Sequence, residues 1–440
     1  MAASLPELQV DRSALKALRR FDEDRLGWLD RATALGPVVA MRMGPLRTFV
    51  VTDPDVARTM LVTESGSWTR PPATVVPIRL AIGENLFTQA DKAWGLLQPA
   101  VAPSLRKRAL EDRLADIDGL IEREVDAIQL DTVVDLELAM GRIALVLAAW
   151  VMFGETLDRG RADEIARNQR EAVGWVGRQV GKINGFIPLA WGGPAREMRR
   201  HTAVLHAYAA ELIARGRERR DDDVLSALVA ARPGGRRLQA RELRSHVLGL
   251  LLAGNETTAA ALSWALVHGA RNPAAWQDLR AEPARCAPTY VTETLRLSPA
   301  VWGIPRVPTR AGVTLAGNGD TSRARRGQVA MVYLRGMNRN PERWADPLRF
   351  DPRRHTGADP VEGARSSRSL LPFGLGPRGC IGQYLALAEM EAALPVLARR
   401  GDVLLEGEIV EDASFALRVR GGLRGRFVTP GRAAIGTNRA

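Results

Sequence analysis

The segment from residue 241 to residue 271 constrains the fold more than any other part of the sequence. It reads RELRSHVLGLLLAGNETTAAALSWALVHGAR and has the spacing of one long helix. Asn272-Pro273 should end this helix, because the residue before a proline avoids helical backbone. Between Val247 and Val267 apolar residues face almost every side. Such a helix has to lie inside a large core, so the segment predicts a sizeable, mainly helical body.

The remaining sequence predicts more helix and a smaller amount of strand. Apolar residues recur every three or four positions over much of 91–230, which is typical of helices. Short β-branched runs broken by Gly-Pro predict two strands and a helix in 36–61. Further short strands are expected in 301–332 and 403–429, and a second helix around 288–297. The fold class is therefore mainly α with a small β-rich region.

Composition and organisation favour one folded domain. The chain has 46% hydrophobic and 25% charged residues, which is ordinary for a globular protein. No internal repeat or low-complexity linker divides it. We expect a single domain over residues 1–440, with its core at about 36–430 and loosely ordered termini.

The formal net charge of +12 does not indicate a nucleic-acid partner. Only four of the 62 basic residues are lysine, and the arginines are spread along the whole chain rather than gathered in a stripe. No zinc-finger spacing or aromatic RNA-binding signature accompanies them. We therefore expect no nucleic-acid binding.

The first 20 residues and the two cysteines indicate a cytoplasmic protein. The amino terminus lacks the apolar run of a secretory signal, and no uninterrupted run reaches the roughly 20 residues needed to cross a bilayer. Two cysteines, Cys286 and Cys380, are too few for a disulfide framework and fit a reducing compartment. We expect no membrane span.

The strongest local feature is a glycine-rich loop that leads into a helix. Residues 372–394 read PFGLGPRGCIGQYLALAEMEAAL, a pattern that delivers Cys380 to a helix start. The helix should run toward Arg400, with Pro395 kinking or shortening it. The amide of Gly382 and the positive end of the helix dipole favour thiolate over thiol. Cys380 is thus suited to be a soft anionic ligand, although a plain structural cysteine fits the same position.

The stretch FGLGPRGCIG resembles the haem-binding loop of the cytochromes P-450, whose pattern is Phe-Gly-x-Gly-x-Arg/His-x-Cys-x-Gly. Every fixed position matches. The resemblance implies that Cys380 is the axial thiolate ligand of the iron in haem b. It also implies that Phe373 packs beside the sulfur and that Arg378 reaches a haem propionate. The implied fold holds the haem between the central helix and the cysteine-bearing helix.

Two further segments resemble structural signatures of the same family. Glu293 and Arg296 match its Glu-x-x-Arg motif, a spacing that allows a carboxylate and a guanidinium to pair on one helix face. Such a pair is otherwise an ordinary surface bridge. Arg354, in FDPRR, matches the arginine that completes the family's buried triad. The resemblance gives these three residues a structural role.

The central helix carries AGNETT, from Ala253 to Thr258, which resembles the family's oxygen-activating segment. The resemblance implies that Ala253 and Gly254 leave room for dioxygen. A backward-bonding hydroxyl opens the helix locally, and Glu256 and Thr257 would act as catalytic proton carriers through water. The alternative is a glycine and two threonines packed in a buried helix.

The residues expected to hold the haem propionates match the family only in part. Trp94 can donate through its indole, but Gln98 stands where the family often has an arginine, so one cation is missing. Arg306, in WGIPRVP, matches another common propionate arginine. The loop 318–326 also departs from the family pattern.

The implied function is that of a monooxygenase, with dioxygen as co-substrate. It would insert one oxygen atom into a small lipophilic substrate, by hydroxylation or epoxidation, in secondary metabolism. Electrons would come from an external ferredoxin or flavodoxin with its reductase, and the basic run 106–108 suits an acidic partner of this kind.

Other outcomes stay open at the level of sequence. Oxidative coupling, desaturation and peroxygenase chemistry use the same motifs, and a haem-binding sensor or a helical protein without haem are further alternatives. The substrate pocket is expected near 70–78, 173–189, 301–304 and 415–417, whose composition suggests only an apolar guest such as a terpenoid, polyketide, fatty acid or peptide product.

Overall fold

The computed structural model of this chain describes residues 5–180, 193–218, 223–317, 320–356 and 370–430. The chain divides into two compact units, each built from separate stretches of sequence. The β-rich unit comprises Met1–Pro72 and Leu295–Cys380, and the helical unit comprises Ala73–Thr294 and Ile381–Ala440. Each unit is described separately below.

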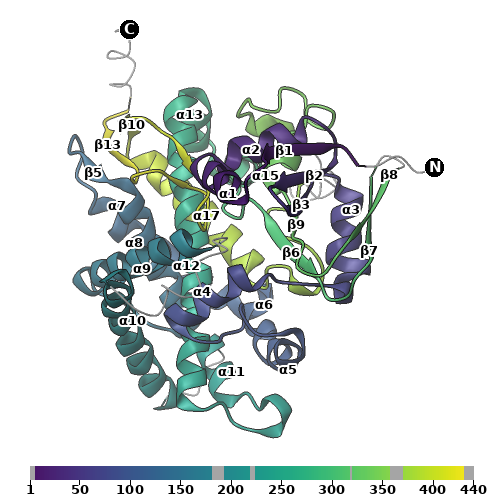
Figure 1. Cartoon of the computed structure of the whole chain (residues 1–440). Coiled ribbons are helices and arrows are strands. Elements are labelled where there is room, and N and C mark those ends of the chain that lie inside the picture. The colour runs from purple at the N-terminus through teal and green to yellow at the C-terminus, as the bar shows by residue number, and fades with distance from the viewer. Residues whose placement is uncertain (1–4, 181–192, 219–222, 318–319, 357–369, 431–440) are drawn as a thin grey trace. The chain divides into compact units, whose positions relative to one another are not determined.

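The β-rich unit contains a six-stranded sheet with the order β1-β2-β3-β9-β6-β4 (Figure 1). β2 and β3 form an antiparallel hairpin whose turn includes Gly44 at φ 61°, a backbone conformation that favours glycine. Strands β7 and β8 form a separate hairpin. The strands are β1 (Glu7–Asp11), β2 (Val38–Met43), β3 (Leu46–Val51), β4 (Trp68–Thr69), β6 (Ile304–Pro308), β7 (Val313–Gly317), β8 (Asp320–Ala324) and β9 (Ala330–Val332).

Short helices complete the β-rich unit. Asp53 caps α3, because its carboxylate accepts the N–H groups of Asp55 and Val56 while Pro54 occupies the first turn. The two strands and the helix predicted in 36–61 are confirmed as β2, β3 and α3. The elements between residues 7 and 33 were not predicted. The helices are α1 (Ala14–Glu23), α2 (Arg25–Thr33), α3 (Pro54–Arg58), α15 (Leu334–Asn338), the π-helix η1 (Thr59–Thr63), and the 3₁₀ turns η2 (Ser65–Ser67), η6 (Pro352–His355) and η7 (Gly376–Arg378).

The helical unit carries most of the helices, as predicted for 91–230. α4 and α14 each extend across a boundary between the two units. The helices are α4 (Pro72–Ile82), α5 (Asp91–Val101), α6 (Lys107–Leu114), α7 (Ile117–Asp126), α8 (Leu136–Phe153), α9 (Arg159–Gln179), α10 (Gly193–Glu218), α11 (Val224–Ala230), α12 (Ala240–Arg271), α13 (Pro273–Ala281), α14 (Pro283–Leu297) and α17 (Gln383–Arg400), with the 3₁₀ turns η3 (Ala102–Leu105) and η5 (Pro233–Gly235).

Small sheets close the helical unit near its carboxyl end. Strands β10, β13 and β5 form one sheet, and β11 and β12 form another. These strands confirm the prediction for 403–429. Their bounds are β5 (Val134–Asp135), β10 (Asp402–Glu406), β11 (Glu411–Asp412), β12 (Arg418–Val419) and β13 (Arg424–Val428).

Helix α12 is the centre of the helical unit. It ends at Arg271 before Asn272, as the sequence predicted, and begins with a capping box between Gln239 and Glu242. It packs along α8 and contacts α10 and α17 (Figure 1). Most of its side chains from Leu243 onward are buried, which confirms a helix through the core.

Two helix boundaries differ from the sequence prediction. α17 continues through Pro395 to Arg400, so the predicted shortening is wrong. Pro395 and its neighbours Leu394 and Leu397 are buried in the core, and this packing offsets the hydrogen bond that proline cannot donate. α14 begins at Pro283, earlier than predicted, and Pro288 lies inside it.

Within the described residues, two helices are long and apolar enough to cross a membrane. These are α8, with a mean hydropathy of 1.8, and α12, with 1.2. In the structure 83% and 78% of their most apolar windows are buried inside the protein, which is typical of core helices.

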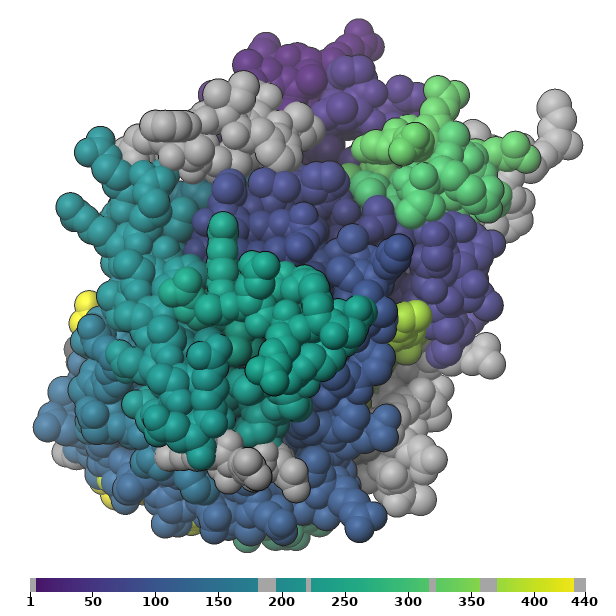
Figure 2. All heavy atoms as spheres, turned by 90° about the horizontal axis from the view of Figure 1, so that it is seen from below, coloured from purple at the N-terminus to yellow at the C-terminus, as the bar shows by residue number. Residues whose placement is uncertain are grey.

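On the outside of the same unit, the teal surface around α11 and η5 lies beside the blue surface that includes α5 (Figure 2).

Candidate active site

Cys380 lies at the end of a loop whose shape depends on two glycines. Gly374 and Gly376 have φ values of 68° and 72°, which side chains disfavour. A Cβ atom at Gly376 would lie 1.9 Å from the carbonyl oxygen of Leu61, so η7 can approach η1 only with glycine there. The amide of Cys380 donates to the carbonyl of Phe373 at 2.9 Å. Main-chain contacts therefore set the position of the cysteine.

The loop leaves Cys380 exposed within a chain that buries most of its apolar residues. α17 begins three residues later at Gln383, with Gly382 as its N-cap. An accessible cysteine at a glycine-rich turn before a helix start is a suitable soft donor for an iron porphyrin. The residues of this loop therefore fit the haem group that the sequence implied.

The β-rich unit also holds the two arginines expected near the propionates. Arg378 lies in η7, and Arg306 lies in β6, opposite Ala330 of β9. A Cβ at Gly374 would lie 3.3 Å from Cδ1 of Ile304, so β6 runs beside the cysteine loop. Both arginines are half-buried.

In the helical unit, α5 carries the partial match to the family's propionate residues. Trp94 and Gln98 lie one turn apart on this helix. The part assigned to Trp94 and the consequence of an uncharged Gln98 stay predictions.

The predicted structural triad includes two arginines that share a main-chain acceptor. Arg296 is fully buried and donates to the carbonyls of Asn338, Pro347 and Arg349, at 2.8, 2.8 and 3.1 Å. Arg354 donates to the carbonyl of Arg349 as well, at 3.3 Å, and to that of Ala345 at 3.0 Å. These bonds hold the irregular segment before η6.

Glu293, the acid of the same motif, is also fully buried, on α14. Its membership of the triad stays a prediction. A buried carboxylate requires compensation by partners, which agrees with a structural rather than a solvent-exposed role.

The predicted oxygen-activating segment lies in the middle of α12. Thr257 Oγ1 donates back to the carbonyl of Ala253 at 2.8 Å, the backward bond that the sequence suggested. A Cβ at Gly254 would lie 3.0 Å from Cε of Met152, so this glycine packs against α8. This contact agrees with the alternative of a glycine packed in a buried helix, and the room that Ala253 and Gly254 leave for dioxygen stays a prediction.

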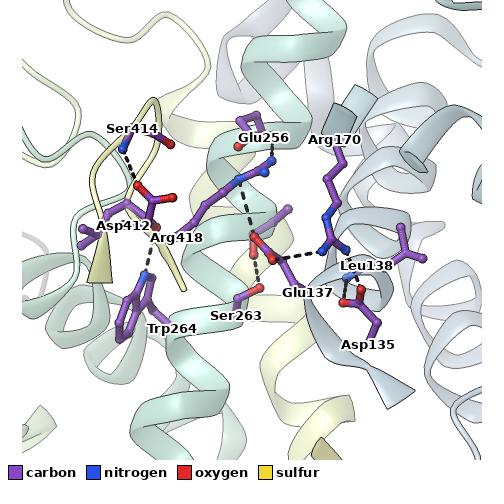
Figure 3. A network of polar contacts seen from close by, with 12 residues as sticks. Asp135, Glu137, Leu138, Arg170, Glu256, Ser263, Trp264, Asp412, Ser414 and Arg418 are labelled. Atoms are coloured by element: carbon purple, nitrogen blue, oxygen red, sulfur yellow. Dashed lines mark hydrogen bonds and ion pairs between the residues drawn. The ribbon is translucent and has the colours of Figure 1, made fainter. Parts of the chain in front are cut away.

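Glu256 is buried and ion-paired (Figure 3). Its Oε2 lies 2.5 Å from Nη2 of Arg418, which comes from β12. Nε of Arg418 lies 3.5 Å from Oε1 of Glu137, and Arg170 links Glu137 to the partly exposed Asp135, at 4.0 and 2.5 Å. No pattern in the sequence indicated Arg418, because it lies 162 residues beyond Glu256.

The network carries opposing electrostatic effects. Burial raises the pKa of Glu137 more than Arg418 and Arg170 lower it. Burial lowers the pKa of Arg418, but attraction to Glu256 and Glu137 outweighs this, and the pKa lies above its usual value. Arg418 therefore stays charged and holds Glu256 as its counter-ion.

A second buried acid, Glu389 of α17, was missed by sequence reasoning. Burial raises its pKa to about 8, although the hydroxyl of Thr258, which donates at 3.3 Å, lowers it. Its other oxygen has no hydrogen-bond partner in the described part of the chain. The sequence signal was an acid inside an apolar helix, EMEAAL, with no means of identifying its neighbour.

An apolar pocket lies in the helical unit beside the same stretch of α12. It is lined by residues from α4, α9, α10 and α12, and the roughly 350 Å³ of space within it is in part open to solvent. Ile78 and Val173, within the ranges expected from the sequence, contribute to it, but Leu248, Leu251 and Leu252 of α12 were not predicted.

Comparison with known proteins agrees with these features. The family model described as Cytochrome P-450 matches residues 28–413. A Streptomyces melanosporofaciens protein named cyclooctat-9-en-7-ol 5-monooxygenase is 25% identical over 85% of this chain and 84% of its own. A Mycobacterium tuberculosis protein, provisionally named cytochrome P-450 137, is 30% identical over 78% of this chain and 72% of its own.

The fold also has a counterpart among solved structures. A six-coordinated cytochrome P-450 from Thermus thermophilus superposes with a TM-score of 0.74, covering 96% of this chain and all of that one at 21% identity. That likeness concerns the fold alone. With the family model matching most of the chain, the cysteine loop and the α12 segment have their explanation: this chain belongs to the cytochrome P-450 family of haem-dependent monooxygenases.

Proposed function

We propose that this protein uses haem b to insert one atom of dioxygen into a small lipophilic substrate, by hydroxylation or epoxidation. The observation that carries the proposal is the exposed Cys380, fixed by main-chain contacts at the end of its glycine-dependent loop. The relative from Streptomyces is named as a monooxygenase of a cyclic alcohol, which supports a role in secondary metabolism. When bound, haem supplies the activation of dioxygen.

On the cysteine side, the protein's own residues bind and orient the cofactor. With haem bound, the thiolate of Cys380 would be the ligand of the iron, and Phe373 would pack beside the sulfur. Arg378, Arg306 and the indole of Trp94 would hold the propionates, and the two arginines would supply the positive charge that Gln98 lacks. We assign all these residues to one P-450 domain.

On the α12 side, Thr257 and Glu256 hold and move protons. The hydroxyl of Thr257 bonds to Ala253, and it can turn to donate instead to a water or an acceptor. Glu256 has one oxygen on Arg418 and one buried oxygen without a partner among the described residues. Oε1 of Glu256 is available to accept a proton, or a hydrogen bond from a water, while Oε2 stays ion-paired with Arg418.

Electrons come from an acidic ferredoxin or flavodoxin with its reductase. Arg106, Lys107 and Arg108 are exposed at the start of α6 and provide a positive surface for such a partner. A cytoplasmic location supplies both the reduced thiol and these partners.

The test begins with the cofactor ligand. Purified protein is reduced and exposed to carbon monoxide, and the position of the main absorption band is recorded for wild type, Cys380→Ala and the matched control Cys286→Ala. We expect the red-shifted band of a thiolate complex in wild type and in Cys286→Ala, and its loss in Cys380→Ala. A band that survives in Cys380→Ala contradicts the assignment.

The reaction is tested with ferredoxin, its reductase, NADPH and labelled dioxygen. A monooxygenase incorporates one labelled oxygen atom into the product. Coupled or desaturated products without label would instead assign the alternative chemistry, and haem binding without turnover would indicate a sensor.

A further inference from the structure

The apolar pocket of the helical unit contains one polar lining residue. Of its eleven described lining residues ten are apolar and none is charged. The polar one is Gln169, on α9. The lining residues are Ile78, Ala81, Ile82, Gln169, Ala172, Val173, Val176, Leu205, Leu248, Leu251 and Leu252.

Gln169 pairs with Asn255 of α12, and the pair is incompletely satisfied. Both side chains are only 3% exposed. Asn255 Nδ2 donates to Gln169 Oε1 at 3.0 Å, while Gln169 Nε2 and Asn255 Oδ1 have no partner among the described residues. Turning both amides by 180° makes Gln169 the donor and Asn255 the acceptor of the hydrogen bond between them, but it leaves the same number of unpaired groups. In either orientation one amide N–H₂ and one amide carbonyl remain unpaired.

Buried polar groups without partners are rare in native proteins because each loses its hydration without a replacement. Here a donor and an acceptor are unpaired on one pair of side chains, and Gln169 of this pair lies in the wall of a pocket whose other described lining residues are apolar. The pocket also shares α12 with the segment Ala253–Thr258, since Leu248, Leu251 and Leu252 come immediately before it. A ligand in this pocket is therefore a substrate-site ligand if the proposed function holds.

We propose that this pocket recognises a neutral, largely hydrocarbon alcohol. The hydroxyl accepts a hydrogen bond from the free amide N–H of the Gln169–Asn255 pair and donates one to its free carbonyl. A ketone could only accept, which would leave the carbonyl unpaired, and an ionised ligand would find no counter-charge on the described lining. The inference rests on the proposed function, because it names the class of substrate for the same site.

The experiment compares matched probes that differ by one hydroxyl. Adamantane with 1-adamantanol, and decalin with 2-decalol, are titrated into the holoenzyme. Binding is followed by the blue shift of the main haem band and, independently, by the ligand-induced rise in Tm. The quantity of interest is the ratio of the Kd of each hydrocarbon to the Kd of its alcohol.

Three variants and one control test the pair. Gln169→Leu and Asn255→Leu each remove half of it, and the double variant replaces both amides by apolar groups of similar size, which guards against loss of folding from one unpaired amide. We expect the ratio to fall by about threefold to tenfold in each variant, the effect of losing a neutral hydrogen bond. The control Val173→Ala should weaken binding of hydrocarbon and alcohol by the same factor.

An unchanged ratio in the double variant overturns the proposal. The unpaired amide N–H₂ and carbonyl of the Gln169–Asn255 pair would then bind a water instead of the ligand. A wild type that binds neither alcohol, by either readout, also overturns it. The Tm readout does not depend on the iron ligand. Loss of the carbon monoxide band in wild type would therefore contradict the proposed function, and the Tm readout would still test this inference. A normal carbon monoxide band with an unchanged ratio would contradict this inference alone.

Discussion

The two units position their functional residues in different ways. In the β-rich unit, main-chain groups are the hydrogen-bond partners of the functional residues. The amide of Cys380 donates to the carbonyl of Phe373, and Arg296 donates to carbonyl groups. In the helical unit, side chains hold side chains, as Glu256 does with Arg418 and Glu389 with Thr258. The bond from Cys380 to Phe373 joins residues close in sequence, whereas the contacts of Arg296 and the side-chain networks join segments that only folding brings together.

The largest expected effect tests the main-chain side of this comparison. Gly376→Ala adds a Cβ at φ 72° and against the carbonyl of Leu61, and we expect a loss of about 2 to 5 kcal/mol in the free energy of unfolding, with poor haem incorporation. Urea unfolding and the carbon monoxide spectrum measure both effects.

The matched control is Gly327→Ala in the same unit. Gly327 has φ 84° but nothing within 4 Å of an added Cβ. The substitution should therefore lower the free energy of unfolding only through backbone strain, by about 1 to 2 kcal/mol, and leave the carbon monoxide spectrum unchanged. Equal effects at the two glycines would mean that the contact with Leu61 is unimportant.

The next effect tests the side-chain network. Arg418→Met leaves Glu256 and Glu137 largely buried without their shared cation, and we expect a loss of about 2 to 4 kcal/mol at pH 7. Adding Glu256→Gln should restore much of that stability, because the unpaired charge is then gone. Denaturant unfolding of the single and double variants measures the coupling, and additive losses would show that the ion pair contributes little.

The third effect is a pH dependence from Glu389. Its pKa is about 8 in the folded protein and near 4.5 when unfolded, so the folded state keeps a proton that the unfolded state releases between these values. Its contribution to stability is complete below about pH 4.5 and is lost as the pH rises to 8.

Glu389→Gln stays neutral and should remove this dependence. We expect wild type to lose of the order of a few kcal/mol relative to the variant between pH 5 and pH 8, in unfolding curves taken at several pH values. Parallel curves for the two proteins would show that Glu389 is ionised in the folded state.

The smallest effect is expected at Thr258. Thr258→Val removes the hydroxyl that donates to Glu389 and should cost about 1 kcal/mol while raising the pKa of Glu389 further. Ser263→Ala is the control, since its hydroxyl bonds to the carbonyl of Ala259 in the same helix. If both variants shift the pH dependence alike, the link between α12 and α17 has no specific role.

Local patterns determined a good deal of the fold. The end of α12 before Asn272 follows from the Asn-Pro stop, and β2, β3 and α3 follow from β-branched runs and a proline after Asp53. The cysteine loop was recognisable because its glycines and Cys380 lie within a few residues of one another. These features depend on neighbours in sequence, which is why they can be read directly from it.

Tertiary structure decided what those features contact. Arg418 reaches Glu256 from 162 residues away, and Gln169 reaches Asn255 from 86 residues away. The continuation of α17 through Pro395 also depends on the core around it rather than on its own propensity. The energy of such contacts comes from burial and pairing between distant segments, and no periodicity or local turn chemistry specifies which arginine or amide will meet which partner.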